Sequence, residues 1–129
     1  MKYFTDAELA CKHCGLLSLH PGFAEALIEL RETLAEPMFV TSACRCLTHN
    51  TAIKGHEKSL HIGDHPVYAA QGQRGSLAVD VAAHDGAYRA RLFVAAWRKG
   101  WSIGWNGPLK FLHLDRRDLV GLPITTFDY

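Results

Sequence analysis

Apolar side chains recur with helical spacing between residues 22 and 34, where four of them fall on one face: Phe23, Leu27, Leu30 and Leu34. This period of about 3.6 residues predicts an amphipathic helix packed on the core, with Pro21 at its start and Pro37 beyond its end. Three further helical segments are expected: a short helix opened by a capping box at residues 5–8, a single turn at 48–53, and a helix that Asp85 caps and that stops near Gly100.

Strands are expected where apolar residues run together: 38–43, 77–82, and a hairpin of 101–105 and 109–115 with its turn at 106–107. The tail 118–129 is expected to wrap over the surface. This order of elements predicts an α+β fold, a small antiparallel sheet with helices packed on one face. Because the chain has no repeat, linker or low-complexity tract, residues 1–129 are predicted to form one domain.

Composition narrows the choice of partners. Hydrophobic residues make up 48% of the chain and charged residues 21%, as in ordinary soluble proteins. The net charge of +1 gives no electrostatic reason to expect nucleic acid or an anionic membrane as partner. No apolar run approaches membrane-spanning length, and the first residues have no signal-peptide core. A protein of this kind that acts outside the cytoplasm must be delivered by another system.

Three segments place an isolated polar side chain in apolar surroundings. His113 and Asp115 share one face of the strand 111–115, Asp80 lies between two valines, and His61 follows a leucine. An unpartnered buried imidazole or carboxylate is costly, so either a hydrogen-bond network or a metal site must satisfy these groups. Two imidazoles and one carboxylate are what a catalytic zinc commonly takes, with the fourth position left for water. The residues alone leave both explanations open.

The same segments carry a family resemblance. Ser-Leu-His at 59–61, Ser-Leu-Ala-Val-Asp at 76–80 and Phe-Leu-His-Leu-Asp at 111–115 resemble the zinc D-alanyl-D-alanine carboxypeptidase family. That family shares its fold with the sonic hedgehog signalling domain and includes many phage cell-wall peptidases. Ser-Ala-Cys-Arg at 42–45, followed by His-Asn at 49–50, is similar to a further segment of the family. The paired cysteines near the N-terminus and Gly104 also fit the phage-associated branch.

The resemblance implies roles for five residues. His61, Asp80 and His113 would bind zinc, and the zinc-bound water would be the nucleophile. Arg45 would be catalytic and substrate-binding, because its planar fork of donors suits a substrate carbonyl or a terminal carboxylate. Ser59 counts with the substrate-binding residues.

The general base is expected at Asp115. Many relatives carry an acid three positions before the last histidine, or a histidine two positions before it, where this chain has Lys110 and Phe111. Asp115 is the nearest carboxylate, two positions after His113 on the same strand face. Two other interpretations stay open: that it orients an imidazole, or that it forms a strand-end salt bridge with Arg116 or Arg117.

The chain departs from the family motif between the first two ligands. They stand nineteen positions apart here against seven in the usual motif, so residues 62–74 look like an inserted loop beside the metal that could shape substrate access. Ser76 stands where the motif has glycine. Either His65 or His56 could replace His61 as first ligand, although Ser59 at the required spacing favours His61.

The function predicted from the resemblance is a zinc metallopeptidase of D,D-carboxypeptidase or endopeptidase type. It would act as a monomer on peptidoglycan stem peptides, at bonds involving D-amino acids, and a phage lysis or tail system could deliver it. The alternative is a weakly active or inactive metal-loaded module that binds wall peptides or a protein partner. A His-Asn-His nuclease, suggested by residues 49–50, lacks the basic surface that phosphates require.

Four cysteines form two close pairs, Cys11 with Cys14 and Cys44 with Cys46. Their spacing is a poor match to a zinc ribbon, and free thiols, a second, structural zinc and disulfides all remain open. None of these states makes the cysteines catalytic. We expect them to brace the N-terminal segment against the segment that follows the first strand.

Overall fold

The computed structural model describes residues 1–63 and 74–129. Its elements in chain order are α1 (Asp6–Leu9), α2 (Pro21–Leu34), β1 (Val40–Ser42), α3 (Leu47–Ala52), β2 (Ala78–Ala82), α5 (Gly86–Arg98), β3 (Ser102–Asn106), β4 (Phe111–Asp115), the 3-10 helix η1 (Arg117–Val120) and β5 (Thr126–Asp128). Most of the expected insertion at 62–74, with His65, lies outside the described residues. None of the helices in the described ranges is long and apolar enough to span a membrane.

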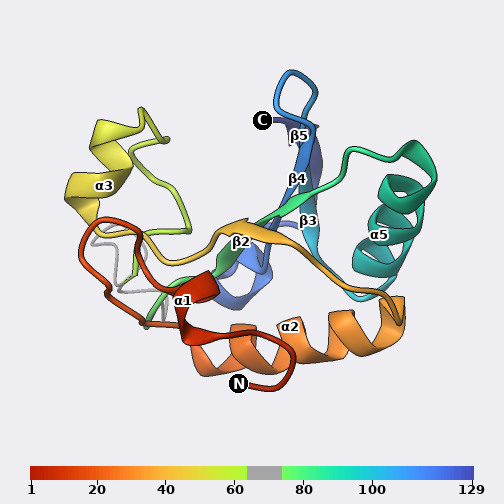
Figure 1. Cartoon of the computed structure of the whole chain (residues 1–129), viewed down its shortest axis with the longest axis horizontal. Helices are drawn as coiled ribbons and strands as arrows, with labels where there is room; N and C mark the ends of the chain where they lie inside the picture. Colours follow the sequence, from red (N-terminus) through yellow and green to blue (C-terminus); the bar gives the residue numbers. More distant parts are fainter. Residues whose placement is uncertain (64–73) are drawn as a thin grey trace.

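The strands form one five-stranded sheet in the order β1-β2-β4-β3-β5 (Figure 1). Neighbouring strands are antiparallel except for β3 and β5, which run parallel. The α+β prediction is therefore confirmed, but the sheet is mixed. The difference comes from the tail, which was expected to lie on the surface and instead adds β5 at the sheet edge beside β3.

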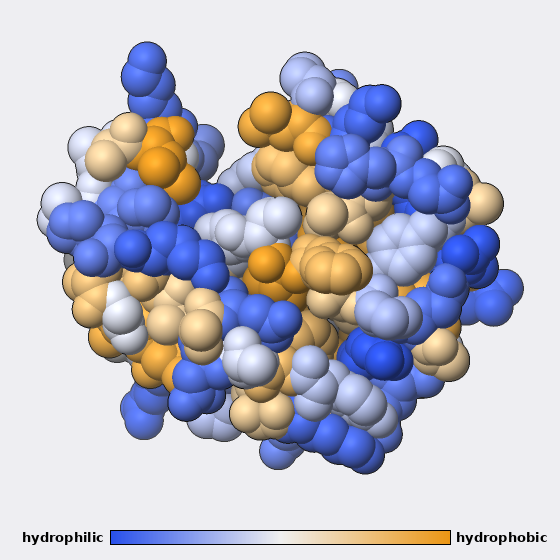
Figure 2. All heavy atoms as spheres, in the orientation of Figure 1, coloured by the Kyte–Doolittle hydropathy of each residue, from blue (hydrophilic) through white to orange (hydrophobic). Residues whose placement is uncertain are grey.

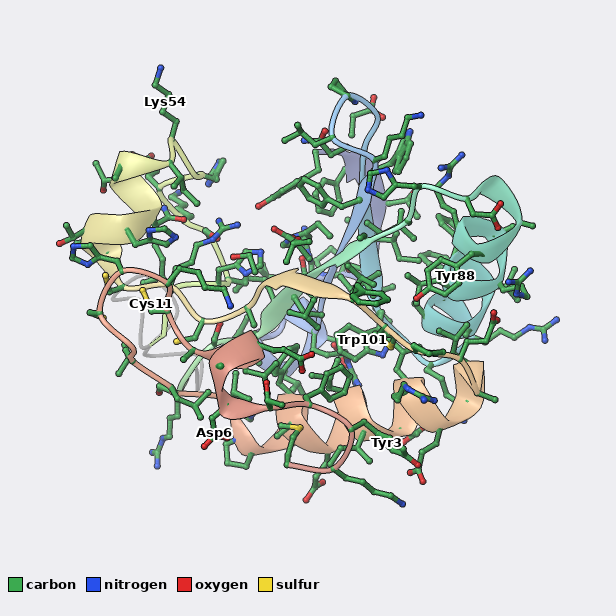
Figure 3. The ribbon with its side chains drawn as sticks, viewed as in Figure 1. Tyr3, Asp6, Cys11, Lys54, Tyr88 and Trp101 are labelled. Carbon is green, nitrogen blue, oxygen red and sulfur yellow. The ribbon has the colours of Figure 1, made fainter. Side chains whose placement is uncertain are left out.

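Helices α2 and α5 pack together on one side of the sheet, and α3 lies on the other side (Figure 1). The four apolar residues that predicted α2 are all buried in the core. Trp101, seen in Figure 3 above α2, packs edge-on against Phe23 at a ring-centroid distance of 5.6 Å. On β4, Leu112 and Leu114 belong to this core, so His113 must face away from α2.

Local capping follows the sequence. The capping box of Thr5 and Glu8 is present with both of its reciprocal hydrogen bonds, and Asp85 caps α5 by accepting from the backbone of Tyr88. These contacts satisfy backbone N–H groups that a helix leaves without internal partners. The predicted helices therefore begin at the expected residues.

Candidate metal centre

The sheet brings Asp80 and His113 together. Asp80 on β2 is the register partner of His113 on β4, and directly opposite residues point to the same face of a sheet. The Nδ1 atom of His113 lies 3.0 Å from Oδ1 of Asp80. Both side chains are buried. A one-residue slip in this register would turn one of them to the helical face, so the pairing of β2 with β4 builds this part of the site.

His61 reaches the pair from the loop before β2. Its Nε2 atom lies 3.1 Å from Oδ1 of Asp80 and 3.2 Å from Nδ1 of His113. Two donors fix its backbone, because the carbonyl of His61 accepts from the N–H of Arg45 at 2.9 Å and from the hydroxyl of Ser76 at 2.7 Å. Ser76, which stands where the family motif has glycine, therefore helps to hold the loop that carries His61.

Partners on the outer side of each imidazole determine which nitrogen carries the proton. Nδ1 of His61 lies 2.7 Å from the carbonyl oxygen of Ala43, which can only accept, so this nitrogen is the donor. Nε2 of His113 lies 2.8 Å from the Asp115 carboxylate and donates there for the same reason. In the neutral tautomers the two inner nitrogens therefore present lone pairs, and they face a carboxylate oxygen.

This donor set fits a divalent cation better than a hydrogen-bond network. If Nδ1 of His113 carried a proton, that proton could form a hydrogen bond in only one of the three short contacts. A cation at the centre would instead interact with all three inner atoms. Ligand atoms bound to zinc at 2.0–2.1 Å in tetrahedral geometry stand about 3.3 Å apart. The inner atoms of His61, Asp80 and His113 stand 3.0 to 3.2 Å apart. Zinc thus fits these residues.

The charge states of His61 and Asp80 agree with metal binding. Burial lowers the pKa of the His61 imidazole, which favours the neutral form that a metal requires. Burial would raise the pKa of Asp80, but the imidazoles of His61 and His113 hold it well below its usual range. For His113 burial would lower the pKa, but the Asp115 and Asp80 carboxylates outweigh it and raise the pKa, so a metal would displace a proton from this imidazole when it binds.

Arg45 contacts the outer edge of the site. Its guanidinium donates to Oδ2 of Asp80 at 3.0 Å, to Oδ1 of Asn50 at 3.2 Å and to Oγ of Ser42 at 3.0 Å. Each of these contacts uses a different nitrogen, so three of the five N–H groups are engaged. Arg45 is buried yet lines the cleft described below, and Asp80 cannot turn away from the other two ligands while this contact holds.

Asp115, expected as the general base, lies on the opposite side of His113 from the three converging atoms. It is fully buried and both of its oxygens are occupied, by Nε2 of His113 and by the guanidinium and backbone N–H of Arg117. Burial would raise the pKa of Asp115, but these partners lower it to about 2. The geometry therefore matches the two interpretations that had been left open, an orienting role and a salt bridge with Arg117.

The other candidates have clear positions. Oγ of Ser59 accepts from the backbone N–H of His61 at 3.2 Å, so it helps to shape the loop that holds the ligand, and Ser59 also lines the cleft. His56, the alternative first ligand, accepts from the backbone of Lys58. The structure brings His61, and not His56, to Asp80 and His113.

The tail supplies residues that the sequence did not identify. The Tyr129 ring stacks on the His113 imidazole at 4.3 Å, and the Phe127 ring contacts it at 5.7 Å. Gly104 makes room for them, since a Cβ there would come within 2.6 Å of Phe127 and 2.9 Å of Tyr129. The available signal was the two-residue spacing of these aromatics, which puts both on one face of a short strand.

Asp80 and His113 line an open cleft of about 860 Å³, and His61 is buried in contact with both of them. One wall comes from the end of α3 and the loop after it, and the other from the β3–β4 hairpin and the tail: Ile53, Lys54, His56, Lys58, Asn106, Leu109, Phe111 and Tyr129. Figure 2 shows the hollow between these walls, and Figure 3 marks Lys54 at its rim. A chain of several residues can enter such a cleft from solvent.

Comparison with known protein families gives a match. The model of a family described as Peptidase M15 matches residues 2–115 of this chain. The match includes every residue of the converging site and Arg45, and it stops before the tail that carries Tyr129. None of the curated proteins matches the chain.

Proposed function

The chain belongs to the peptidase M15 family, whose members are zinc-dependent metallopeptidases, and we propose that it hydrolyses peptide bonds involving D-amino acids in peptidoglycan stem peptides. The observation that carries this proposal is the convergence of His61, Asp80 and His113, two of which line an open cleft. Delivery to a bacterial wall by a phage lysis or tail system is part of the same proposal.

His61, Asp80 and His113 would hold the zinc, with Asp115 keeping the His113 imidazole in the required tautomer. When bound, zinc supplies a Lewis acid that polarises a carbonyl and lowers the pKa of water toward about 7. In this proposal Asp115 is a positioning residue, because a carboxyl group with a pKa of about 2 is a weak base near neutral pH.

Arg45 and Tyr129 would stabilise the negative charge that develops on the amide oxygen. Burial and the Asp80 carboxylate raise the pKa of the Tyr129 hydroxyl, so it stays protonated and can donate a hydrogen bond. Arg45 has N–H groups beyond the three used within the site and lines the same cleft. Donors fixed before the reaction lower the barrier without having to reorganise.

Charge on the cleft rim supports a stem peptide as substrate. Lys54 and Lys58 lie on the wall that follows α3, and both are exposed. Stem peptides carry free carboxylates, which lysine ammonium groups attract. An acidic peptide lying along the cleft would therefore be held by its carboxylates while its scissile bond reaches the bottom.

A binding module is the second candidate. Lys110 takes the position where many relatives carry an acid, and the Asp115 carboxylate is already engaged. Of the described residues, Asp128 is the remaining acidic side chain that lines the cleft. A protein without a suitable base would hold wall peptides and release few products.

The test is digestion of purified peptidoglycan by zinc-loaded protein, with released peptides identified by mass spectrometry. We expect either free D-alanine or opened cross-links, lost on chelation and in His113→Ala. A matched pair of synthetic peptides that differ only in the chirality of the terminal alanines tests the D-amino acid requirement. Stem-peptide binding without any product would favour the binding module, and neither binding nor product would contradict both candidates.

A further inference from the structure

A second group of metal-ligating side chains lies away from the cleft, where the loop after α1 meets the start of α3. The Sγ atoms of Cys11, Cys14 and Cys46 lie within 4.8 Å of one another. We propose that these three thiols, with His13 as fourth ligand, bind a structural zinc ion that joins the N-terminal segment to α3. This inference goes beyond the proposed peptidase function and stands on different residues.

The loop that carries Cys11 and Cys14 is folded as a tight turn. The N–H of Cys11 donates to the carbonyl of Leu16 at 2.7 Å, and the N–H of Gly15 donates to the carbonyl of Cys11 at 2.8 Å. Gly15 has a φ of +76°, a left-handed conformation that lets the chain turn back. The turn brings both thiols of a C-x-x-C segment to one side, as thiolate zinc sites require.

Cys46 completes the sulfur set from a different part of the chain. It is the N-cap of α3, and its Sγ accepts from the backbone N–H of His49 at 3.4 Å. Its own backbone N–H donates to Sγ of Cys11 at 3.3 Å. Backbone donors directed at sulfur stabilise the thiolate form that binds metals.

His13 offers a further donor beside these three thiols. Its Nδ1 atom lies 3.5 Å from Sγ of Cys46. In a tetrahedral site with Zn–S near 2.3 Å and Zn–N near 2.0–2.1 Å, sulfur and nitrogen ligands stand about 3.6 Å apart. The His13 ring lies nearly parallel to the His49 ring, with the two ring centroids 6.4 Å apart. Cys44 is excluded, since its Sγ is directed at the carbonyl of Ser18.

Zinc accounts for this cluster better than a disulfide does. A disulfide would join two of the three thiols and leave the third beside it without a partner. Sulfur ligands on a tetrahedral zinc stand about 3.8 Å apart, so a small movement of side chains that lie within 4.8 Å would complete the site. Three thiolates and one imidazole form a closed site with no position left for substrate.

The position of this site suggests its effect. Cys44 donates from its backbone to the carbonyl of Leu9, Cys46 donates to Cys11, and between them Arg45 donates to His61. Figure 3 shows Cys11 in the loop beside α3. A zinc ion here would therefore fix the segment that presents Arg45 and the start of α3, the helix that leads into one wall of the cleft.

Zinc content measured by elemental analysis tests the proposal. We expect two zinc ions per wild-type chain, one in Cys14→Ser and one in His113→Ala. The control is Cys44→Ser, which replaces the cysteine outside the cluster and should retain two. Cys14 is exposed, so its substitution leaves the core intact. One zinc in the wild type that Cys14→Ser does not remove would overturn the proposal.

Two further measurements test the site, and the first uses the unaltered protein, so that no variant has to fold. A mercurial reagent that attacks thiolates should release one zinc from wild type and leave the other bound. Cobalt substitution should give a thiolate-to-cobalt absorption band that Cys14→Ser abolishes and His113→Ala retains. A Cys11–Cys14 disulfide found by mass spectrometry would contradict the site. An unchanged zinc affinity in His13→Ala would remove His13 from the ligand set.

The outcome is independent of catalysis. Two zinc ions in a protein that hydrolyses no stem peptide would support the second site and contradict the proposed function. One zinc in an active peptidase would do the reverse.

Discussion

The two clusters of metal-ligating side chains differ in how the fold builds them. The His-Asp-His cluster joins the loop before β2 with two paired strands, and its three residues are all buried. The cysteine cluster joins a loop and a helix cap, and one of its residues, Cys14, is exposed. The sheet thus provides a rigid group of ligands beside an open cleft. The surface loop provides a group of sulfur ligands that do not line this cleft.

The two clusters also differ in the groups that form hydrogen bonds to their side chains. Around His61, Asp80 and His113, protein groups occupy the outer atom of each side chain: the Ala43 carbonyl, Arg45 and Asp115. Around Cys11 the donors are backbone N–H groups of neighbouring residues. The first arrangement orients the ligands and leaves one side of the centre for water or substrate, as catalysis requires. The second arrangement stabilises thiolates. Four predictions test this contrast.

The largest effect is expected from His113→Ala. Loss of one imidazole should remove zinc from the sheet site, because the remaining two ligands cannot hold it firmly. Peptidase activity should fall to the level of chelator-treated protein. Cys14→Ser should instead lower the melting temperature and retain turnover in the folded protein. Equal loss of turnover in both variants, measured below their melting temperatures, would contradict the assignment of a catalytic role to one cluster and a structural role to the other.

Tyr129→Phe should lower kcat by about a hundredfold, the usual effect of removing a donor to a developing oxyanion. The ring remains, so its stacking on His113, the zinc content and KM should change little. Tyr3→Phe is the matched control, because Tyr3 is exposed and its hydroxyl donates to Glu32 on the surface. A fall in zinc content together with kcat would show that Tyr129 acts by supporting His113.

Local patterns in the sequence were sufficient for most of the fold. The capping box at Thr5, the helical period of α2 and the hairpin of β3 and β4 each depend on residues close in the chain, and each is confirmed. The hairpin turn was expected at 106–107, but Asn106 still pairs with Phe111 as part of β3, so the turn lies at 107–110. The strand β5 was not predicted. Its parallel partner β3 lies about twenty residues earlier, and a three-residue strand whose pairing is non-local leaves no periodic signal.

The candidate site was predictable as residue types but not as contacts. The family motif pointed to His61, Asp80 and His113, and the structure brings them together. The partners of Asp115 were open because a strand pattern does not say which neighbour a carboxylate will choose. Tyr129 was missed because its role depends on β5 and on the space that Gly104 leaves.

Asp115→Asn should weaken zinc at the sheet site by about tenfold to a hundredfold, as loss of an orienting carboxylate behind a histidine ligand usually does. The amide keeps the shape of the side chain but no longer carries the charge that supports the imidazole. Zinc affinity can be measured by competition with a coloured chelator. Asp118→Asn is the control, because Asp118 pairs with Arg116 and contacts none of the three ligands.

The smallest effect concerns stability in acid. Burial would raise the pKa of Asp115, but Arg117 and His113 lower it from 3.8 to about 2. Because the folded-state value is depressed, this carboxylate contributes stability that is present above about pH 4 and lost as the pH falls toward 2. The difference corresponds to about 2 kcal/mol in the free energy of unfolding.

Urea unfolding of metal-free protein between pH 2 and pH 5 would measure this contribution. Asp115→Asn, which cannot titrate, should show a shallower loss of stability over that range than wild type, whereas the surface variant Asp118→Asn should follow wild type more closely. Cys14→Ser should not alter the slope, because no cysteine titrates there. An unchanged slope in Asp115→Asn would mean that the buried ion pair with Arg117 does not favour the ionised carboxylate, and the orienting role of Asp115 would lose its electrostatic basis.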